Sequence, residues 1–204
     1  MLKLFGHQES GHAFKVKLAL TIADIEHHYE WVDIEAPRES RSLEFRSHSR
    51  FSEVPLLLDE GEPYIQSNAI LLHIAHRFNV LGGGDTVLMQ RCREWLFWEA
   101  NKIGLCLPQL RAYKRQNAPE MQEQTLEWLL SRYKHDVVVL NDVLSDGRGF
   151  IVGDLFTIAD CSLCGYLTFA DEAEVDLPPF VESWLNRISS LDGWKHPYEL
   201  LTQR

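Results

Sequence analysis

The sequence lacks several features that mark common classes of protein. No stretch approaches the ~20 consecutive apolar residues that a membrane-spanning helix needs. Positive charge is not in excess, since 20 basic against 30 acidic residues give a net charge of −10. That balance excludes a sequence-independent nucleic-acid binder, which needs a basic surface. Four cysteines in 204 residues do not form a secreted disulfide scaffold. We therefore expect neither nucleic acid nor a membrane as a partner.

The amino terminus also lacks a targeting segment. Residues 1–7 do not contain the ~7–15-residue apolar core of a signal peptide. We therefore expect a cytoplasmic protein. Its length fits one large or two small domains, and its 45% of hydrophobic residues can build a substantial core.

The first third of the chain alternates strand and helix patterns. Residues 2–5 and 29–34 predict strands, the second because it is aromatic and β-branched. Between them, apolar residues recur at the helical spacing i, i+3, i+4 and i+7, namely Val16, Ala19, Leu20 and Ala23. A strand, a helix and a second strand imply a right-handed crossover and a parallel pair.

A second group of elements follows an irregular polar stretch at 37–52, which holds one short helix around Leu43 and Phe45. Residues 54–58 and 63–65 predict two strands joined by a turn. Ser67 then has the position of an N-cap for a helix from Asn68 to about Phe78. The expected order is βαβ followed by ββα.

The rest of the chain has a helical pattern. Gly82–Asp85 is its clearest break, so we expect a domain at 1–78, a linker at 79–86 and an all-helical domain at 87–204. The sequence predicts helices from Thr86 to Leu107, ending before Pro108, then over 126–144 and 179–189. Residues 157–160 are similar to a capping box that opens another helix. The fold class is therefore α+β.

Four segments carry a resemblance to a known family. They are Ser10–Val16, Glu53–Leu57, Ile65–Ile70, and Phe150–Asp154 leading to Thr157–Asp160. Their order and spacing resemble the cytosolic glutathione S-transferase superfamily over nearly the whole chain. The resemblance implies a thioredoxin-like amino-terminal domain, an all-helical carboxyl-terminal domain, glutathione as co-substrate without a metal, and a homodimer.

The resemblance also implies which residues hold glutathione. In the family the peptide before Pro55 is cis, and the backbone of Val54 pairs with the cysteinyl unit as an added strand would. Gln66 and Ser67 stand where a helix begins, which suits the γ-glutamyl carboxylate. The alternatives are an edge-strand proline of structural use only and a plain N-cap.

Two residues near the first helix are candidates for catalysis. The nucleophile in such a transferase is the glutathione thiolate. Ser10 supplies both a hydroxyl donor and a helix start, which favour a charged sulfur, although it could serve only as a cap. His12 could donate to the thiolate, accept its proton, or be a solvated loop residue.

The chain departs from the family just before Val54. Relatives usually have Asn-Pro-x-Gly-Lys/Gln there, whereas this chain has Ser-Arg-Phe-Ser-Glu, and Glu53 would repel the glycyl carboxylate. The basic residues that could replace the missing Lys or Gln are Arg38, Arg41, His48 and Arg50. We include Arg50 among the expected glutathione-binding residues.

Three further patterns lie outside the glutathione site. Phe97, Asn101 and Leu105 form an i, i+4, i+8 stripe on the first helix after the linker, which the resemblance makes a pocket for a small hydrophobic electrophile. Cys161 and Cys164 have redox spacing, but they fall inside a predicted helix, so we interpret them as core residues. His73 and His76 share a helix face without a third metal ligand, so we expect no metal site.

The resemblance leads to two functional hypotheses. The first is a detoxifying glutathione transferase that activates the thiolate for attack on the electrophile. The alternative is a non-catalytic protein of the same fold that binds glutathione or protein partners. Ser10, Val54, Gln66 and Ser67 favour the enzyme, whereas Glu53 favours the binding protein.

Overall fold

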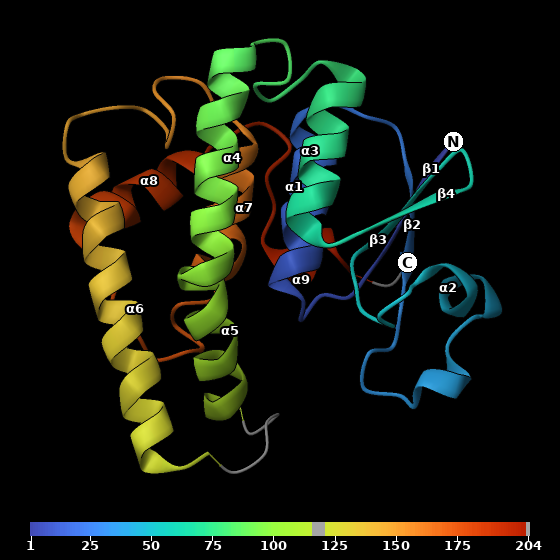
Figure 1. Cartoon of the computed structure of the whole chain (residues 1–204), viewed down its shortest axis with the longest axis horizontal. Coiled ribbons are helices and arrows are strands. Elements are labelled where there is room, and N and C mark those ends of the chain that lie inside the picture. The colour runs from blue at the N-terminus through green and yellow to red at the C-terminus, as the bar shows by residue number, and fades with distance from the viewer. Residues whose placement is uncertain (116–120, 203–204) are drawn as a thin grey trace. The chain divides into compact units, whose positions relative to one another are not determined.

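The computed structural model describes residues 1–115 and 121–202. The chain forms two compact units (Figure 1). The first contains residues 1–84 together with the chain from residue 191 onward, and the second spans Asp85–Ser190. Each unit has its own core and is described by itself. No helix among the described residues combines the length and apolar character needed to cross a bilayer.

The first unit is built on a four-stranded mixed sheet. Its strands are β1 (Leu2–Gly6), β2 (His28–Trp31), β3 (Leu56–Asp59) and β4 (Glu62–Ile65), in the order β2-β1-β3-β4. Its helices are α1 (Gly11–Ile22), the 3-10 turn η1 (Arg38–Ser40), α2 (Leu43–His48), α3 (Ser67–Phe78) and α9 (Pro197–Leu200). β1 and β2 are parallel, as the crossover predicts, and the β1–β3 and β3–β4 pairs are antiparallel. The expected thioredoxin-like βαβ-ββα order is confirmed.

The two faces of the sheet are covered by different helices (Figure 1). Alternate residues of a strand point to opposite faces, so Leu4 and Phe5 enter separate clusters. One cluster joins the sheet to α1 and α3, and consists of Leu2, Leu4, Val16, Leu20, Leu57, Ile70 and Ile74. The other joins it to α2, and consists of Phe5, Val32, Phe45, Leu56 and Leu58. Both faces are buried, which holds β1 and β3 rigidly in the centre.

The ends of α3 differ partly from expectation. Ser67 is the first helical residue rather than the N-cap, and Gln66 takes the cap position without a side-chain capping bond. The helix ends at Phe78, and the left-handed backbone of its C-cap Asn79 (φ 56) suits a helix terminus. A Cβ at Gly83 would lie 1.8 Å from the Ala75 carbonyl oxygen, so only glycine fits this turn. The glycine run at 82–84 therefore forms a tight turn against the end of α3.

The chain from residue 191 onward packs on the first unit, whereas the sequence assigns it to the helical domain. The Tyr198 hydroxyl donates to the Glu9 carboxylate over 3.1 Å. The Tyr29 hydroxyl donates to the Leu201 carbonyl over 3.0 Å, and the Leu201 side chain is buried. Sequence periodicity cannot show this return, because it depends on contacts between residues far apart in the chain.

The second unit is helical throughout its regular elements. These are α4 (Thr86–Asn101), α5 (Ile103–Lys114), α6 (Glu123–Leu144), α7 (Ile158–Leu167) and α8 (Pro179–Ser189). α4 packs on α7, α5 on α6, and α6 on α8. Its core includes Leu96, Leu107, Leu140, Leu163 and Trp184. The α+β class, with a mostly helical second part, is confirmed.

The long helix predicted over 86–107 breaks at another place. The expectation that it ends before Pro108 is wrong, because Pro108 lies inside α5 and the break is at Lys102. Just after the break, a Cβ at Gly104 would lie 2.4 Å from the Glu99 carboxylate. That buried carboxylate accepts from the Ser162 hydroxyl at 3.2 Å. The backbone thus approaches a buried acid closely just after the break.

The predicted capping box is confirmed at the start of α7. The Thr157 hydroxyl accepts from the Ala159 amide, and the Asp160 carboxylate accepts from the Thr157 amide over 2.9 Å. The predicted core role of Cys161 and Cys164 is also confirmed, since both are fully buried free thiols. Burial raises the pKa of the Cys161 thiol well above its ordinary value, so it stays protonated.

Candidate functional site

A small cavity in the first unit brings several of the predicted residues together. Its volume is about 80 Å³, and its lining residues are His12, Ser49, Phe51, Glu53, Val54, Pro55, Ile65, Gln66 and Ser67. Five of these are among our candidates, and they come from three separate segments of the sequence. The start of α1, the approach to β3 and the start of α3 therefore converge on one place.

Val54 offers its backbone to this cavity. The Val54–Pro55 peptide is cis, as the resemblance implies. β3 begins only at Leu56, and no group among the described residues forms a hydrogen bond with the Val54 N–H or C=O. Backbone polar groups in folded proteins are nearly always paired. An extended ligand could therefore satisfy both groups by pairing as an added strand does.

The residue before α3 has an unusual backbone. Gln66 has φ 69 and ψ 113, a left-handed conformation that costs a non-glycine residue about 1–3 kcal/mol. Such conformations persist where the surrounding fold imposes them, and they concentrate at binding sites. This feature is invisible in the sequence, because nothing about a glutamine predicts a positive φ.

Ser67 lies at the first helical position of α3, on the wall of the cavity. Its side chain is buried, and its hydroxyl oxygen lies 3.4 Å from Nδ1 of His12. The first amide groups of a helix have no partner within the helix and carry partial positive charge. The start of α3 can therefore bind a carboxylate, with the Ser67 hydroxyl as an additional donor.

His12 is a neutral group in this cavity. Burial, with a smaller contribution from the nearby Lys15 ammonium, lowers its pKa to about 3. An imidazole with that pKa is a poor proton acceptor at neutral pH, but it still carries one N–H donor. Of the roles considered for His12, the neutral donor is the one that this environment favours.

Ser10 caps α1, two residues before the cavity-lining His12. Its hydroxyl oxygen accepts from the Ala13 amide over 3.1 Å. The cap leaves the hydroxyl hydrogen without an acceptor among residues 1–115 and 121–202. Ser10 does not line the cavity itself, although His12, two residues later, does. The geometry is therefore compatible with both the cap and the thiolate donor.

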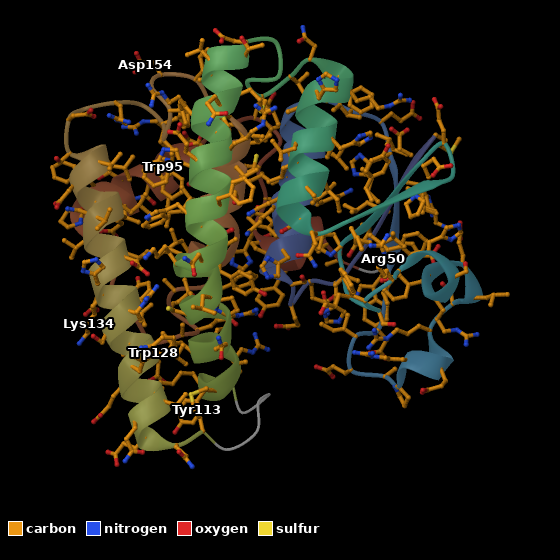
Figure 2. All side chains as sticks on the ribbon, viewed as in Figure 1. Arg50, Trp95, Tyr113, Trp128, Lys134 and Asp154 are labelled. Atoms are coloured by element: carbon orange, nitrogen blue, oxygen red, sulfur yellow. The ribbon has the colours of Figure 1, made fainter. Side chains whose placement is uncertain are left out.

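The basic residues considered near Val54 do not line the cavity. The guanidinium of Arg41 donates to the carbonyl oxygens of Ser52 and Ile34, over 2.7 and 2.8 Å. Arg50, labelled in Figure 2 on the segment between α2 and β3, is exposed, and its guanidinium lies 5.9 Å from the Phe51 ring centre. Among the described residues that line the cavity, the acidic or basic residues are therefore Glu53 and His12.

Two more candidates lie on the α2 side of the segment. His48 Nδ1 bonds the Glu44 carbonyl at 2.9 Å, so this imidazole is used within α2. Arg38 is exposed on η1 and also lies outside the cavity lining. Neither supplies positive charge to the wall that contains Glu53.

The predicted second-substrate residues belong to the other unit. Phe97 and Asn101 lie on α4, where both are exposed, and 75% of the Phe97 surface is accessible. Leu105 is half-buried on α5, beyond the break at Lys102. The regular spacing predicted that these three residues lie along one helix. The break at Lys102 instead places Leu105 on a different helix from Phe97 and Asn101.

The His73 and His76 pair forms a structural contact. His73 Nε2 bonds the Asp59 carboxylate at 2.8 Å, and its ring stacks on Tyr64 with centres 3.7 Å apart. His76 is exposed. Within the described ranges, no three His, Cys, Asp or Glu side chains gather as metal ligands would.

Sequence reasoning did not assign roles to all the lining residues. Ser49, Phe51 and Ile65 complete the cavity, and Ser49 is buried with its hydroxyl donating to the Glu53 carbonyl over 3.1 Å. Ser49 and Phe51 belong to the segment that departs from the family pattern. Ile65 ends a strand and is a packing residue by type, so no pattern marked it.

Comparisons with known proteins agree with this arrangement. Residues 1–76 match the family "Glutathione S-transferase, N-terminal domain". The chain is 27% identical to the disulfide-bond oxidoreductase YfcG of Escherichia coli, over 91% of this chain and 88% of that protein. It is also 27% identical to a possible glutathione S-transferase from Rhodopseudomonas palustris, with a TM-score of 0.82, over 100% of this chain and 99% of that one.

A third protein shares the fold at lower identity. It is a glutathione transferase family member from Pseudomonas fluorescens Pf-5, whose crystal structure has two glutathione bound. It is 20% identical, with a TM-score of 0.82 over 98% of this chain and 92% of that one. The domain match, the relatives and the fold agree: residues 1–76 belong to the glutathione S-transferase amino-terminal domain family, and the chain as a whole has the fold of the cytosolic glutathione S-transferases.

Proposed function

We propose that the protein is a glutathione transferase that activates the glutathione thiolate for attack on a small hydrophobic electrophile. The observation that carries this proposal is the convergence of the unpaired Val54 backbone, the start of α3 and the neutral His12 on one cavity. The Pseudomonas fluorescens relative, whose structure has two glutathione bound, supports glutathione as the co-substrate.

In this proposal each part of the tripeptide has its own anchor. The γ-glutamyl carboxylate binds Gln66 and Ser67 at the start of α3. The cysteinyl backbone pairs with Val54, next to Pro55. The thiol then reaches the start of α1, where the Ser10 hydroxyl and the helix amides favour the thiolate. His12 donates from its neutral ring and helps to orient Ser67.

The reaction requires only that the sulfur lose its proton before attack. The thiolate forms a bond to the electrophilic carbon, and a leaving group such as a halide departs with the electron pair of the broken bond. We propose that the electrophile contacts Phe97, Asn101 and Leu105, of which Phe97 offers exposed apolar surface. The name of the Escherichia coli relative suggests a disulfide as an alternative substrate, because the same thiolate can attack a sulfur.

Binding and turnover must be measured separately to test this proposal. We expect reduced glutathione to bind in calorimetry, and an aryl halide to be conjugated at a rate that depends on the glutathione concentration. Binding without conjugation or disulfide reduction would favour the non-catalytic alternative. Absence of glutathione binding to the folded protein would refute the proposal.

We further propose that the protein acts as a cytoplasmic homodimer in detoxification, as the family resemblance implies. A two-fold dimer is the commonest soluble oligomer. Light scattering should then give twice the 23.6 kDa of one chain at micromolar concentration. A mass equal to one chain would refute the dimer.

A further inference from the structure

The charge of the cavity points to a thiol ligand different from free glutathione. Glutathione ends in a glycyl carboxylate, which needs donors or positive charge where it binds. The side chains along the cavity offer one carboxylate, that of Glu53, and the other ionisable group, His12, is neutral at pH 7. No lysine or arginine side chain among the described residues forms part of the lining.

The position of the ligand's third residue follows from the anchors proposed for its γ-glutamyl and cysteinyl units, so this inference depends on the proposed function. A ligand whose γ-glutamyl end is at Ser67 and whose middle residue pairs with Val54 occupies the side of the cavity that these two residues form. The remaining polar wall is formed by Ser49 and Glu53, beside Phe51. We place the group that follows the cysteinyl unit against this wall, because Glu53 directly precedes Val54 in the chain.

The donors close to this wall in the sequence are directed at the backbone or lie outside the cavity lining. The Ser49 hydroxyl donates to the Glu53 carbonyl over 3.1 Å. Nη1 and Nη2 of Arg41 donate to backbone carbonyls, its buried Nε has no partner among the described residues, and neither Arg41 nor Arg50 belongs to the lining. The exposed Glu53 side chain thus presents an acceptor with negative charge to the end of the ligand. An N–H donor or an ammonium group matches that wall, whereas a carboxylate is repelled.

We propose that the site selects a γ-glutamyl-cysteinyl thiol whose third residue is amidated, with an N–H or ammonium group facing Glu53. Glu53 is then the residue that determines specificity at this end of the ligand. The thiol chemistry at Ser10 is unchanged, because the difference lies at the opposite end of the tripeptide.

Three probes that differ only at the glycyl end test this proposal. They are reduced glutathione, its glycyl carboxamide, and its amide with ethylenediamine, which ends in an ammonium group. Calorimetry at low salt should show the carboxamide binding about tenfold more tightly than glutathione, and the cationic amide at least as tightly as the carboxamide. At about 0.5 M salt the preference should shrink, because charges at an exposed wall are screened.

Variants separate charge from size. Glu53→Gln should reduce the preference for the carboxamide to twofold or less, and Glu53→Lys should make glutathione the tighter ligand. Glu62→Gln is the matched control, because Glu62 is exposed at the opposite end of the β3–β4 hairpin and outside the cavity lining. It makes the same change in net charge and should leave the preference intact.

The possible failures have different meanings. If wild-type protein binds glutathione and its carboxamide equally at low salt, or if Glu53→Gln leaves the preference unchanged, this inference is wrong while the proposed function stands. If none of the three thiols binds, the proposed function is wrong, and this inference with it.

Discussion

Nδ1 of His12 lies 3.4 Å from the hydroxyl oxygen of Ser67, although 55 residues separate them in the sequence. The contact joins the first turn of α1 to the first turn of α3. The positive ends of two helices therefore lie beside one cavity, where each can stabilise an anionic group. Glutathione in its reactive form carries two such groups that could use them, the γ-glutamyl carboxylate and the thiolate.

The low pKa of His12 predicts a pH dependence of stability. In the folded protein it is about 3, below the ~6.5 of an unfolded chain, so the unfolded state binds more protons between these values. Stability conferred by His12 is therefore complete above pH 6.5 and is lost as the pH falls toward 3, by up to about 1.4 kcal/mol per pH unit. His12→Asn should remove the His12 contribution and leave a shallower slope, because burial also lowers the pKa of His7 and of His27.

Urea unfolding between pH 7 and 4 checks the slope through the midpoint and the free energy of unfolding. His76→Asn is the control, since His76 is exposed and its replacement should leave the slope of the wild type. Parallel curves for wild type and His12→Asn would show that His12 is not held neutral by the fold.

Ser10→Ala tests the activation of the thiol. A shift of two pKa units in bound glutathione corresponds to about 2.7 kcal/mol of preferential thiolate stabilisation. Losing the hydroxyl should lower turnover by about ten- to a hundredfold and move the pH–rate profile upward, with glutathione binding nearly unchanged. Thiolate absorbance in the ultraviolet, titrated in both proteins, measures the pKa directly. Coinciding titrations would leave Ser10 as a helix cap only.

Ser67→Ala tests the γ-glutamyl anchor. The change removes one hydrogen bond to a charged group, roughly 1.5–3 kcal/mol, so the dissociation constant for glutathione should rise at least tenfold. Ser47→Ala is the matched control, because Ser47 is exposed on α2 and outside the cavity lining. Calorimetry on the folded variants provides the measurement. An unchanged constant in Ser67→Ala would rule out this anchor.

Asp160→Asn should destabilise the second unit. The buried Asp160 carboxylate accepts from the Ile151 amide, from the amide and hydroxyl of Thr157, and from the Trp184 indole, at 2.9–3.0 Å. An asparagine cannot accept all four bonds, so we expect a loss of about 3 kcal/mol in the free energy of unfolding. The same change at the exposed Asp171 should cost little. Equal urea midpoints for the two variants would contradict this role.

The sequence predicts much of the first unit, because its signals are local. The short strand pattern at 2–5, the helical spacing in α1 and the glycine run at 82–84 each act over a few residues. The capping box at Thr157 and Asp160 is equally local, and the structure confirms it. The break at Lys102 could not be predicted in this way. It coincides with the close approach of Gly104 to the buried Glu99 carboxylate, which accepts from Ser162 of another helix, while Pro108 gave a misleading stop signal.

The site shows the same division. Val54, Gln66 and Ser67 belong to short segments with a recognisable order, and the structure brings them into one cavity. The positive φ of Gln66 and the hydrogen bonds of Arg41 Nη1 and Nη2 to backbone carbonyls are consequences of the tertiary structure. Arg50 had a favourable charge and position in the sequence, but its side chain lies outside the cavity lining. Charge in a sequence does not reveal which groups a basic side chain will contact.

The Tyr198–Glu9 hydrogen bond has a consequence for the synthesis of the protein. A chain leaving the ribosome exposes β1 and α1 early, yet the segment that covers them is translated only after the whole second unit. The second unit, continuous in sequence, can fold while translation proceeds. Translation of the first unit begins before that of the second unit and is completed after it. A fragment ending at Gly84 would therefore leave uncovered the surface on which Tyr198 and Leu201 pack.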